Sequence, residues 1–329
     1  MHRDPPPHRP TSRRRALLLC AAPVLSVACG RAWGLPGPQA ARDVADAAQL
    51  LDTHFGDDDK LAAAERMLRR AVAQEPSNAQ ACLQMARLEL ARHAGAGDDG
   101  SAVRPWLNRA LALAPDEPKV HLLQAELHAL NGHQAARRAA LDQARALLRT
   151  PDPWLTIGYA RFHGDAGDWT LARQLYLRVE ADGPGPNPST RQAYITALTR
   201  LAHFTAISSD PARLRGLAAQ AARERHPDDA WVLGRFAARF VAVGLFEDAV
   251  VHARAALQVM DHTAARLTLA AGLYGQAAML IHAQDSPAAA PLIDEARALG
   301  LDGRRVLERL SHGGAPVQAL MPVLRQIIP

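Results

Sequence analysis

Runs of aspartate are the first candidates for chemistry in this sequence, because carboxylates bind cations. Residues 57–59 are three consecutive aspartates, and residues 98–101 read Asp-Asp-Gly-Ser. A calcium loop needs oxygen ligands at alternating positions and a bidentate acid at a fixed distance along the chain, and neither run provides them. An aspartate before a helix instead caps its free backbone N–H groups, so we expect Asp59 to cap a helix that begins at Lys60 or Leu61.

Histidine and cysteine, the usual ligands of transition metals, are scattered along the chain. His121 and His128 are seven positions apart, whereas two histidines that share a metal on one helix are three or four positions apart. His133 lies near a predicted turn. Cys82 falls on the apolar side of a predicted helix, and no two cysteines form a CxxC pair. These residues predict neither a metal site nor a redox pair.

Motifs for nucleotide binding and nucleophilic catalysis are absent from the sequence. The glycines at 183 and 185 lack the preceding strand and the third glycine of a dinucleotide loop. The sequence contains no P-loop and no G-x-S-x-G elbow. We therefore predict a protein that is not an enzyme and has no cofactor. A catalytic group assembled only in space stays open as an alternative.

Composition favours helices and argues against a nucleic-acid partner. The chain is 48% hydrophobic and 5% aromatic, and its apolar residues are mostly Ala and Leu, which lose little side-chain entropy in a helix. The formal net charge is +5, of which residues 1–28 contribute +4. Acidic and basic residues are interleaved along the remainder, which lacks the clustered cations that release counterions from nucleic acid.

The first 28 residues have the features of an export signal. An arginine-rich start precedes an apolar run over 16–28, which is short for a transmembrane helix. The small side chains of Ser26 and Ala28 predict cleavage before Cys29. An uncleaved anchor or a buried helix is the alternative. The glycines and prolines of residues 29–40 predict a flexible tether.

Two further resemblances concern the route of export. Residues 12–17, Ser-Arg-Arg-Arg-Ala-Leu, resemble a bacterial twin-arginine signal in which Ala16 replaces the usual Phe. Residues 26–29 resemble a lipobox, which implies Cys29 as a lipidation site and outer-membrane anchoring, because Gly30 follows rather than Asp. These resemblances imply a periplasmic protein or an outer-membrane lipoprotein. Sec and twin-arginine export both remain open, as do cleavage by the ordinary peptidase and lipidation.

A two-helix unit is clearest between Asp229 and Met260. Large and small apolar residues recur at helical spacing up to Phe240, Gly244 interrupts the pattern, and a second apolar stripe begins at Phe246. Two antiparallel helices approach closely where small residues face each other and large residues fill the holes beside them. The glycine supplies the left-handed conformation that ends a helix.

This unit resembles the tetratricopeptide repeat, which has 34 residues, a late alanine and a closing proline. The late small residue recurs at Ala71, Ala110, Ala144, Val179, Ala222, Ala256 and Ala296. Two of the separations equal 34, and longer ones coincide with loop insertions at 93–100 and 183–188. The resemblance implies an all-α, right-handed α-solenoid of about seven antiparallel helix pairs over residues 41–300, with capping helices over 301–329. Repeats of this kind bury their apolar faces on their neighbours, so we expect one continuous array.

In the resembling family, the first helices of the pairs line a concave groove that holds a peptide or a partner helix. The resemblance implies a groove of outward residues: Arg87, Lys119, Glu126, Trp154, Arg161 and Trp231. Aromatic anchors beside arginine are typical of binding hot spots. The alternative is that Trp154 and Trp231 pack against the adjacent helix. The lysine and asparagine pair of a chaperone-tail clamp is absent.

These observations predict a non-catalytic scaffold of the bacterial cell envelope that binds another polypeptide, such as an envelope assembly component. A glycan- or peptidoglycan-binding module, or an accessory protein of polysaccharide export, is the alternative, because tryptophans also stack on sugars. We predict no contact with nucleic acid, and contact with a membrane only through lipid at Cys29.

Overall fold

The structure is a computed structural model that describes residues 37–329 apart from 56, 94–99 and 209. The predicted signal over 1–28, Cys29 and the aspartates at 98 and 99 lie outside the described residues. The helices are α1 (Pro38–Asp52), α2 (Asp58–Gln74), α3 (Ala79–His93), α4 (Val103–Leu113), α5 (Pro118–Leu130), α6 (Gln134–Leu147), α7 (Pro153–Asp165), α8 (Trp169–Asp182), α9 (Pro188–Ile207), α10 (Pro211–Glu224), α11 (Ala230–Ala242), α12 (Phe246–Val259), α13 (Thr263–His282), α14 (Ser286–Ala298), α15 (Gly303–Ser311) and α16 (Ala315–Ile327).

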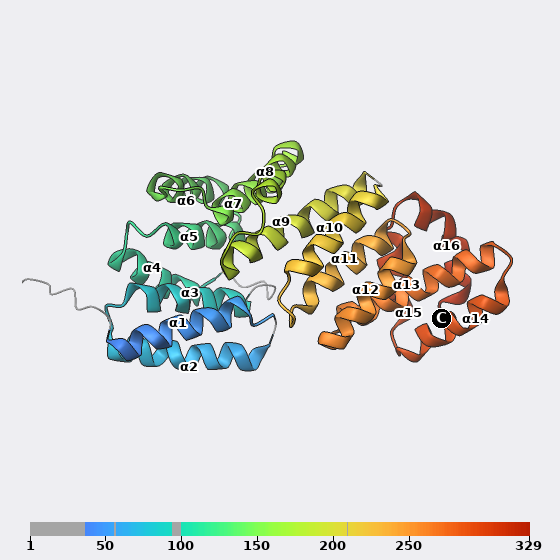
Figure 1. Cartoon of the computed structure of the whole chain (residues 1–329), viewed down its shortest axis with the longest axis horizontal. Coiled ribbons are helices and arrows are strands. Elements are labelled where there is room, and N and C mark those ends of the chain that lie inside the picture. Colours follow the sequence, from blue (N-terminus) through green and yellow to red (C-terminus); the bar gives the residue numbers. More distant parts are fainter. Residues whose placement is uncertain (1–36, 56, 94–99, 209) are drawn as a thin grey trace, which may run out of the picture. The chain divides into compact units, whose positions relative to one another are not determined.

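Consecutive helices pack as pairs, from α1 with α2 to α13 with α14, and each pair packs on the next (Figure 1). This is the α-solenoid of seven helix pairs that the sequence predicts, and the described residues contain no strand. The two terminal helices, α15 and α16, both pack on α13. The array begins at Pro38, inside the segment predicted to be a tether.

The small residues predicted to mark the second helices are buried, except for the one in α10. Ala71, Ala110 and Ala256 have no exposed surface. The residue predicted for α10 is wrong, because Ala222 is exposed and Ala221 is buried in its place. Leu214, Leu217 and Ala221 recur at intervals of three and four and face the core, and the next position is turned about 100° away from that stripe.

Glycines end several first helices, and an aspartate caps the start of α2. Gly132, Gly167 and Gly244 end first helices with φ of 68°, 84° and 78°, a region that favours glycine. The cap predicted for α2 is wrong by two positions. The side chain of Asp57 accepts hydrogen bonds from the backbone of Asp59 and Lys60, so the helix begins at Asp58.

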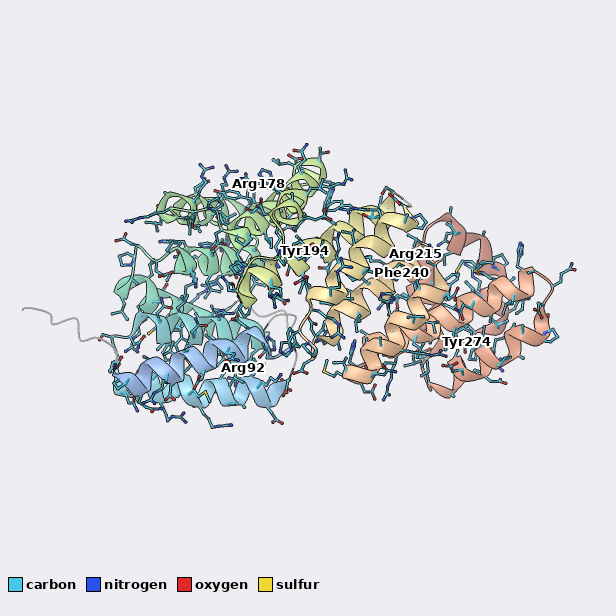
Figure 2. The ribbon with its side chains drawn as sticks, in the orientation of Figure 1. Arg92, Arg178, Tyr194, Arg215, Phe240 and Tyr274 are labelled. Atoms are coloured by element: carbon cyan, nitrogen blue, oxygen red, sulfur yellow. The ribbon has the colours of Figure 1, made fainter. Side chains whose placement is uncertain are left out.

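The core is largest in the C-terminal half, where Phe236, Phe240 and Phe246 are fully buried; Figure 2 labels Phe240 within it. Within the described residues, α13 is the helix whose length and hydropathy would suit a membrane span, but 61% of its apolar window is buried inside the protein. It packs on α11, α12, α14, α15 and α16, so its composition is explained by its central position in the core.

A polar contact joins α6 to α7, and we expect it to give a pH-dependent stability. The Tyr159 hydroxyl donates to Asp142 at 2.6 Å, and Arg138 lies over the tyrosine ring at 5.3 Å. Burial and this hydrogen bond raise the pKa of Tyr159 to about 12. Because this pKa lies above the ordinary value of 10, the stabilisation is complete below pH 10 and is lost as pH rises towards 12.

Tyr159→Phe is therefore expected to lower the free energy of unfolding by about 1 kcal/mol at pH 8. The difference from the parent should shrink as pH rises through the window above, because only the parent loses a hydrogen bond there. Urea unfolding across that pH series measures it. Tyr194→Phe is the control for burial alone, since burial also raises the pKa of Tyr194 but its hydroxyl makes no hydrogen bond to the described residues. A pH-independent difference would rule out this role of the hydroxyl.

Candidate functional site

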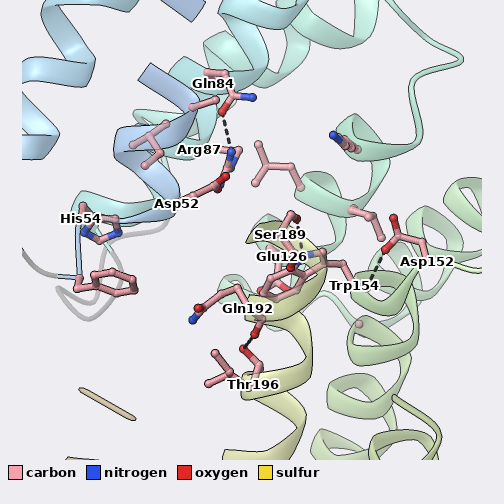
Figure 3. Close-up of a pocket in the computed structure, with 18 of the residues that line it drawn as sticks. Asp52, His54, Gln84, Arg87, Glu126, Asp152, Trp154, Ser189, Gln192 and Thr196 are labelled. Atoms are coloured by element: carbon pink, nitrogen blue, oxygen red, sulfur yellow. Dashed lines mark hydrogen bonds and ion pairs between the residues drawn. The ribbon is translucent and has the colours of Figure 1, made fainter. Parts of the chain in front are cut away.

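The odd-numbered helices α1 to α11 all line one cavity of about 800 Å³. Figure 3 labels wall residues from α1, α3, α5, α7 and α9. All six residues predicted to line a groove lie on its wall: Arg87, Lys119, Glu126, Trp154, Arg161 and Trp231. They come from α3, α5, α7 and α11, and α1, α9 and Leu141 of α6 contribute further wall residues. Every first helix of six successive pairs therefore presents part of its surface to the same space.

Two arginines of this cavity are held by neighbouring repeats. The Arg87 guanidinium donates to Asp52 at 2.7 Å and to Gln84 at 2.8 Å. Arg161 donates to Glu126 at 2.8 Å, and its Nε is buried with no acceptor among the described residues. These ion pairs join α3 to α1 and α7 to α5. The wall is therefore fixed in place, and the guanidinium groups have little freedom to lose when an occupant binds.

Both tryptophans are half-buried and use their indole N–H groups within the chain. Trp154 Nε1 donates to the carbonyl oxygen of Ser189 at 3.1 Å and to its hydroxyl at 3.0 Å. Trp231 Nε1 donates to the carbonyl oxygen of Phe55, 2.5 Å away in the loop between α1 and α2, and its ring stacks on His262 with centroids 4.4 Å apart. The rings rather than their N–H groups are thus what an occupant would contact.

The charges on the wall balance. Its carboxylates are Asp52, Glu126, Asp152 and Asp229, and its cations are Arg87, Lys119, Arg161 and Arg235. Lys119 is exposed and has no ion-pair partner among the described residues. Burial raises the pKa of Asp229, which caps α11 by accepting from the backbone of Trp231. Burial is also the main cause that lowers the pKa of His54, so this histidine is neutral near pH 7.

His121 and Cys82, two of the metal-ligand types considered above, are buried and contact the protein interior. His121 is buried, with Nε2 2.7 Å from the carbonyl oxygen of Pro115 and Nδ1 2.9 Å from Gln124. Cys82 is buried in the core, and burial raises the pKa of its thiol. In the part of the chain that the structure describes, no three His, Cys, Asp or Glu side chains are grouped as metal ligands.

Several wall residues were missed by sequence reasoning. Asp52 and Phe55 come from the end of α1 and the loop after it, and Ser189 and Gln192 come from α9. Their positions depend on how successive pairs stack, which no single repeat shows. Arg235 had a detectable signal, because it follows Trp231 by four residues and so lies on the same helix face.

These repeats are tetratricopeptide-like. Their helix pairs, buried small residues and glycine turns are those that the resemblance implies. No family model matches the chain, and no curated protein matches it.

The solved structures that this chain matches include the following three. A tetratricopeptide repeat protein from Parabacteroides merdae is 13% identical with a TM-score of 0.39, over 84% of this chain and 99% of that one. PilW, a widely conserved type IV pilus biogenesis factor, is 14% identical with a TM-score of 0.37, over 80% and 94%. YrrB, described as having an unusual peptide-binding site, is 11% identical with a TM-score of 0.32, over 73% and 96%.

Proposed function

We propose that this chain is a non-catalytic scaffold that binds a partner polypeptide in the cavity lined by α1 to α11. The observation that carries the proposal is the convergence of six first helices on one space. A cavity of this volume falls in the range that accommodates ligands, which suits a short segment of a polypeptide. Its wall combines apolar side chains, two aromatic rings and charges of both signs, which suits a segment of mixed composition.

We further propose that the protein works in the bacterial cell envelope, as a periplasmic protein or an outer-membrane lipoprotein. The arginine-rich start, the apolar run and the lipobox-like residues 26–29 support this proposal. The partner would then be a component of an envelope assembly. The mass of the mature N-terminus, with or without lipid on Cys29, distinguishes a periplasmic protein from a lipoprotein.

Lys119→Glu is expected to weaken recovery of the partner from envelope extracts by about tenfold, the equivalent of 1.4 kcal/mol. This change reverses a charge on the cavity wall without breaking an ion pair within the described residues. The melting temperature should not change, because the side chain is exposed. Quantitative pull-down of the same partner with parent and variant measures the effect.

Arg178→Glu is the matched control. Arg178 is likewise exposed and without an ion-pair partner among the described residues, but it does not line this cavity (Figure 2). It should recover the partner as the parent does. Equal recovery by both variants and the parent would refute binding at this wall.

A further inference from the structure

A second cavity, of about 410 Å³, is strongly cationic. It lies between α11, α13 and α15, and its wall includes Arg235, Arg239 and Arg309 together with His262 and His312. Among the residues that the structure describes, no aspartate or glutamate lines it. The first cavity balances its charges, so this absence of acid distinguishes the second one.

The arginines of the second cavity also lack ion-pair partners among the described residues, although the charge of Asp229 acts on Arg235. Within the described residues, Arg235, Arg239 and Arg309 form no ion pair, whereas Arg87 and Arg161 of the first cavity are both paired. Arg239 and Arg309 are half-buried. Burial lowers the pKa of Arg239, and the nearby charges of Arg200 and Arg309 lower it further. Cations crowded in this way repel one another, and a bound anion would relieve that repulsion.

An unused hydrogen-bond donor accompanies these cations. His262 Nδ1 accepts from the backbone of Ala265 at 3.2 Å, which leaves the proton on Nε2 when the ring is neutral. Burial lowers the pKa of His262, so neutrality is its ordinary state near pH 7. The Nε2 atom is buried and has no acceptor among the described residues. Among the described residues, the arginines of this wall thus lack ion-pair partners and this N–H group lacks an acceptor.

The second cavity adjoins the first, because Trp231 and Arg235 line both. A chain that occupies the first cavity can therefore continue into the second. Arg235 and Arg239 are one helical turn apart, a rise of about 6 Å along α11. In an extended chain, side chains on one face recur every second residue, at about 6.6 Å. Carboxylates at alternate positions of an extended segment therefore match the spacing of the two arginines.

We propose that the second cavity binds an acidic, extended segment of the partner polypeptide, with carboxylates at alternate positions paired to Arg235 and Arg239 and a further one within reach of Arg309. This rests on the proposed function only for the polypeptide nature of the occupant. Guanidinium groups bind phosphates and uronates as well as Asp and Glu. The spacing and the shared wall favour a peptide over an anionic glycan or a lipid headgroup.

Titration of the full chain with a labelled peptide tests the proposal. The peptide has about eight residues, roughly 26 Å when extended, with glutamate at alternate positions. It should bind about tenfold more tightly than the same peptide with glutamine in place of glutamate. A peptide of identical composition in which no two glutamates are two positions apart should bind severalfold more weakly than the alternating one. Fluorescence anisotropy at low and moderate salt gives the dissociation constants.

Variants locate the site. Arg235→Gln together with Arg239→Gln should weaken binding of the alternating peptide about tenfold, whereas Arg178→Gln, outside both cavities, should leave it unchanged. If the double variant loses helicity, Arg235→Gln alone keeps the test, because Arg235 reaches solvent. An equal effect of Arg178→Gln would overturn the proposal, as would equal binding of the glutamine peptide or of the peptide without glutamates two positions apart. Tighter binding of an oligouronate or of phosphatidylglycerol vesicles would overturn the choice of a peptide.

The test is independent of the one for the first cavity. Lys119→Glu should not weaken the acidic peptide, because Lys119 does not line the second cavity. If the acidic peptide binds and Lys119→Glu leaves partner recovery unchanged, the first proposal fails and this one stands. If Lys119→Glu reduces recovery and the peptide shows no preference for glutamate, only this one fails.

Discussion

Gly275→Ala is expected to destabilise the array by about 2 kcal/mol, although alanine is the better helix former. Gly275 lies on α13, and a Cβ atom there would overlap the ring of Phe246 at the start of α12. Phe246 is fully buried in the main core, so its ring cannot turn aside into solvent. The cost of overpacking, about 1–3 kcal/mol or more, exceeds the gain of about 1 kcal/mol in helix propensity.

The matched control for this change has the opposite sign. Gly216 lies inside α10, is exposed, and has no atom within 4 Å of the position that a Cβ would take. Gly216→Ala should therefore stabilise the protein by about 0.5–1 kcal/mol. Guanidinium unfolding monitored by circular dichroism compares the two. A stabilising effect at both positions would mean that α12 and α13 do not approach as closely as described.

A second substitution identifies the cause of the destabilisation. Phe246→Leu removes the ring that the new Cβ would overlap, so the two changes should be coupled. The Gly275→Ala, Phe246→Leu double variant should be more stable than the sum of the two single effects predicts, by about 1 kcal/mol. Simple additivity would place the cost of Gly275→Ala somewhere other than the contact with Phe246.

Phe240→Ala is expected to lose about 3–5 kcal/mol, the largest single effect that we predict. The Phe240 side chain is fully buried in the main core, and its ring lies 4.9 Å from that of His252 on the following helix. Its removal leaves a cavity that the stacked helices cannot close, because each is held from both sides. Ile207→Ala is the control, since Ile207 is 72% exposed and should cost under about 0.5 kcal/mol.

The shape of the unfolding curve of Phe240→Ala should show whether the repeats still unfold together. Repeat arrays are stabilised mainly by contacts between neighbours, so a local defect can uncouple the repeats around it. We expect the C-terminal repeats to unfold first in this variant, which would give a broadened or two-step curve. A loss below about 1.5 kcal/mol would show that the site collapses to fill the space.

The helix pairs could be predicted because they depend on local patterns. Gly132, Gly167 and Gly244 lie where the chain must adopt positive φ, and the small residues recur at helical spacing. The prediction that Ala222 is buried was wrong because residues 221 and 222 are both alanine, and only packing shows which one faces the core. Asp59 was wrongly predicted to cap α2 for a similar reason, since any of three consecutive aspartates could serve.

The walls of the two cavities likewise contain residues that the sequence predicts and residues that it does not. Arg87, Lys119 and Arg161 line one space because they are outward residues of successive first helices, which the periodicity reveals. Their role in binding stays a prediction. The grouping of Arg239 with Arg309 was beyond the sequence, because it requires α15 to fold back over α13. Contacts between elements that are distant in sequence leave no periodic signal.

The hydrogen bond from Trp231 to Phe55 links the first helix pair to the sixth beside the first cavity. It joins residues 176 positions apart, and near it Lys60 pairs with Asp228 at 3.3 Å. One hydrogen bond, one exposed ion pair and the ring contact between Phe55 and His226 contribute on the order of 1–3 kcal/mol, well below the stability of a folded domain. The contacts of Phe55 can therefore break while the helices remain intact, so amide exchange at Phe55 should be faster than global unfolding allows. Phe55 and Trp231 both line the first cavity, so an occupant that contacts both would slow this opening.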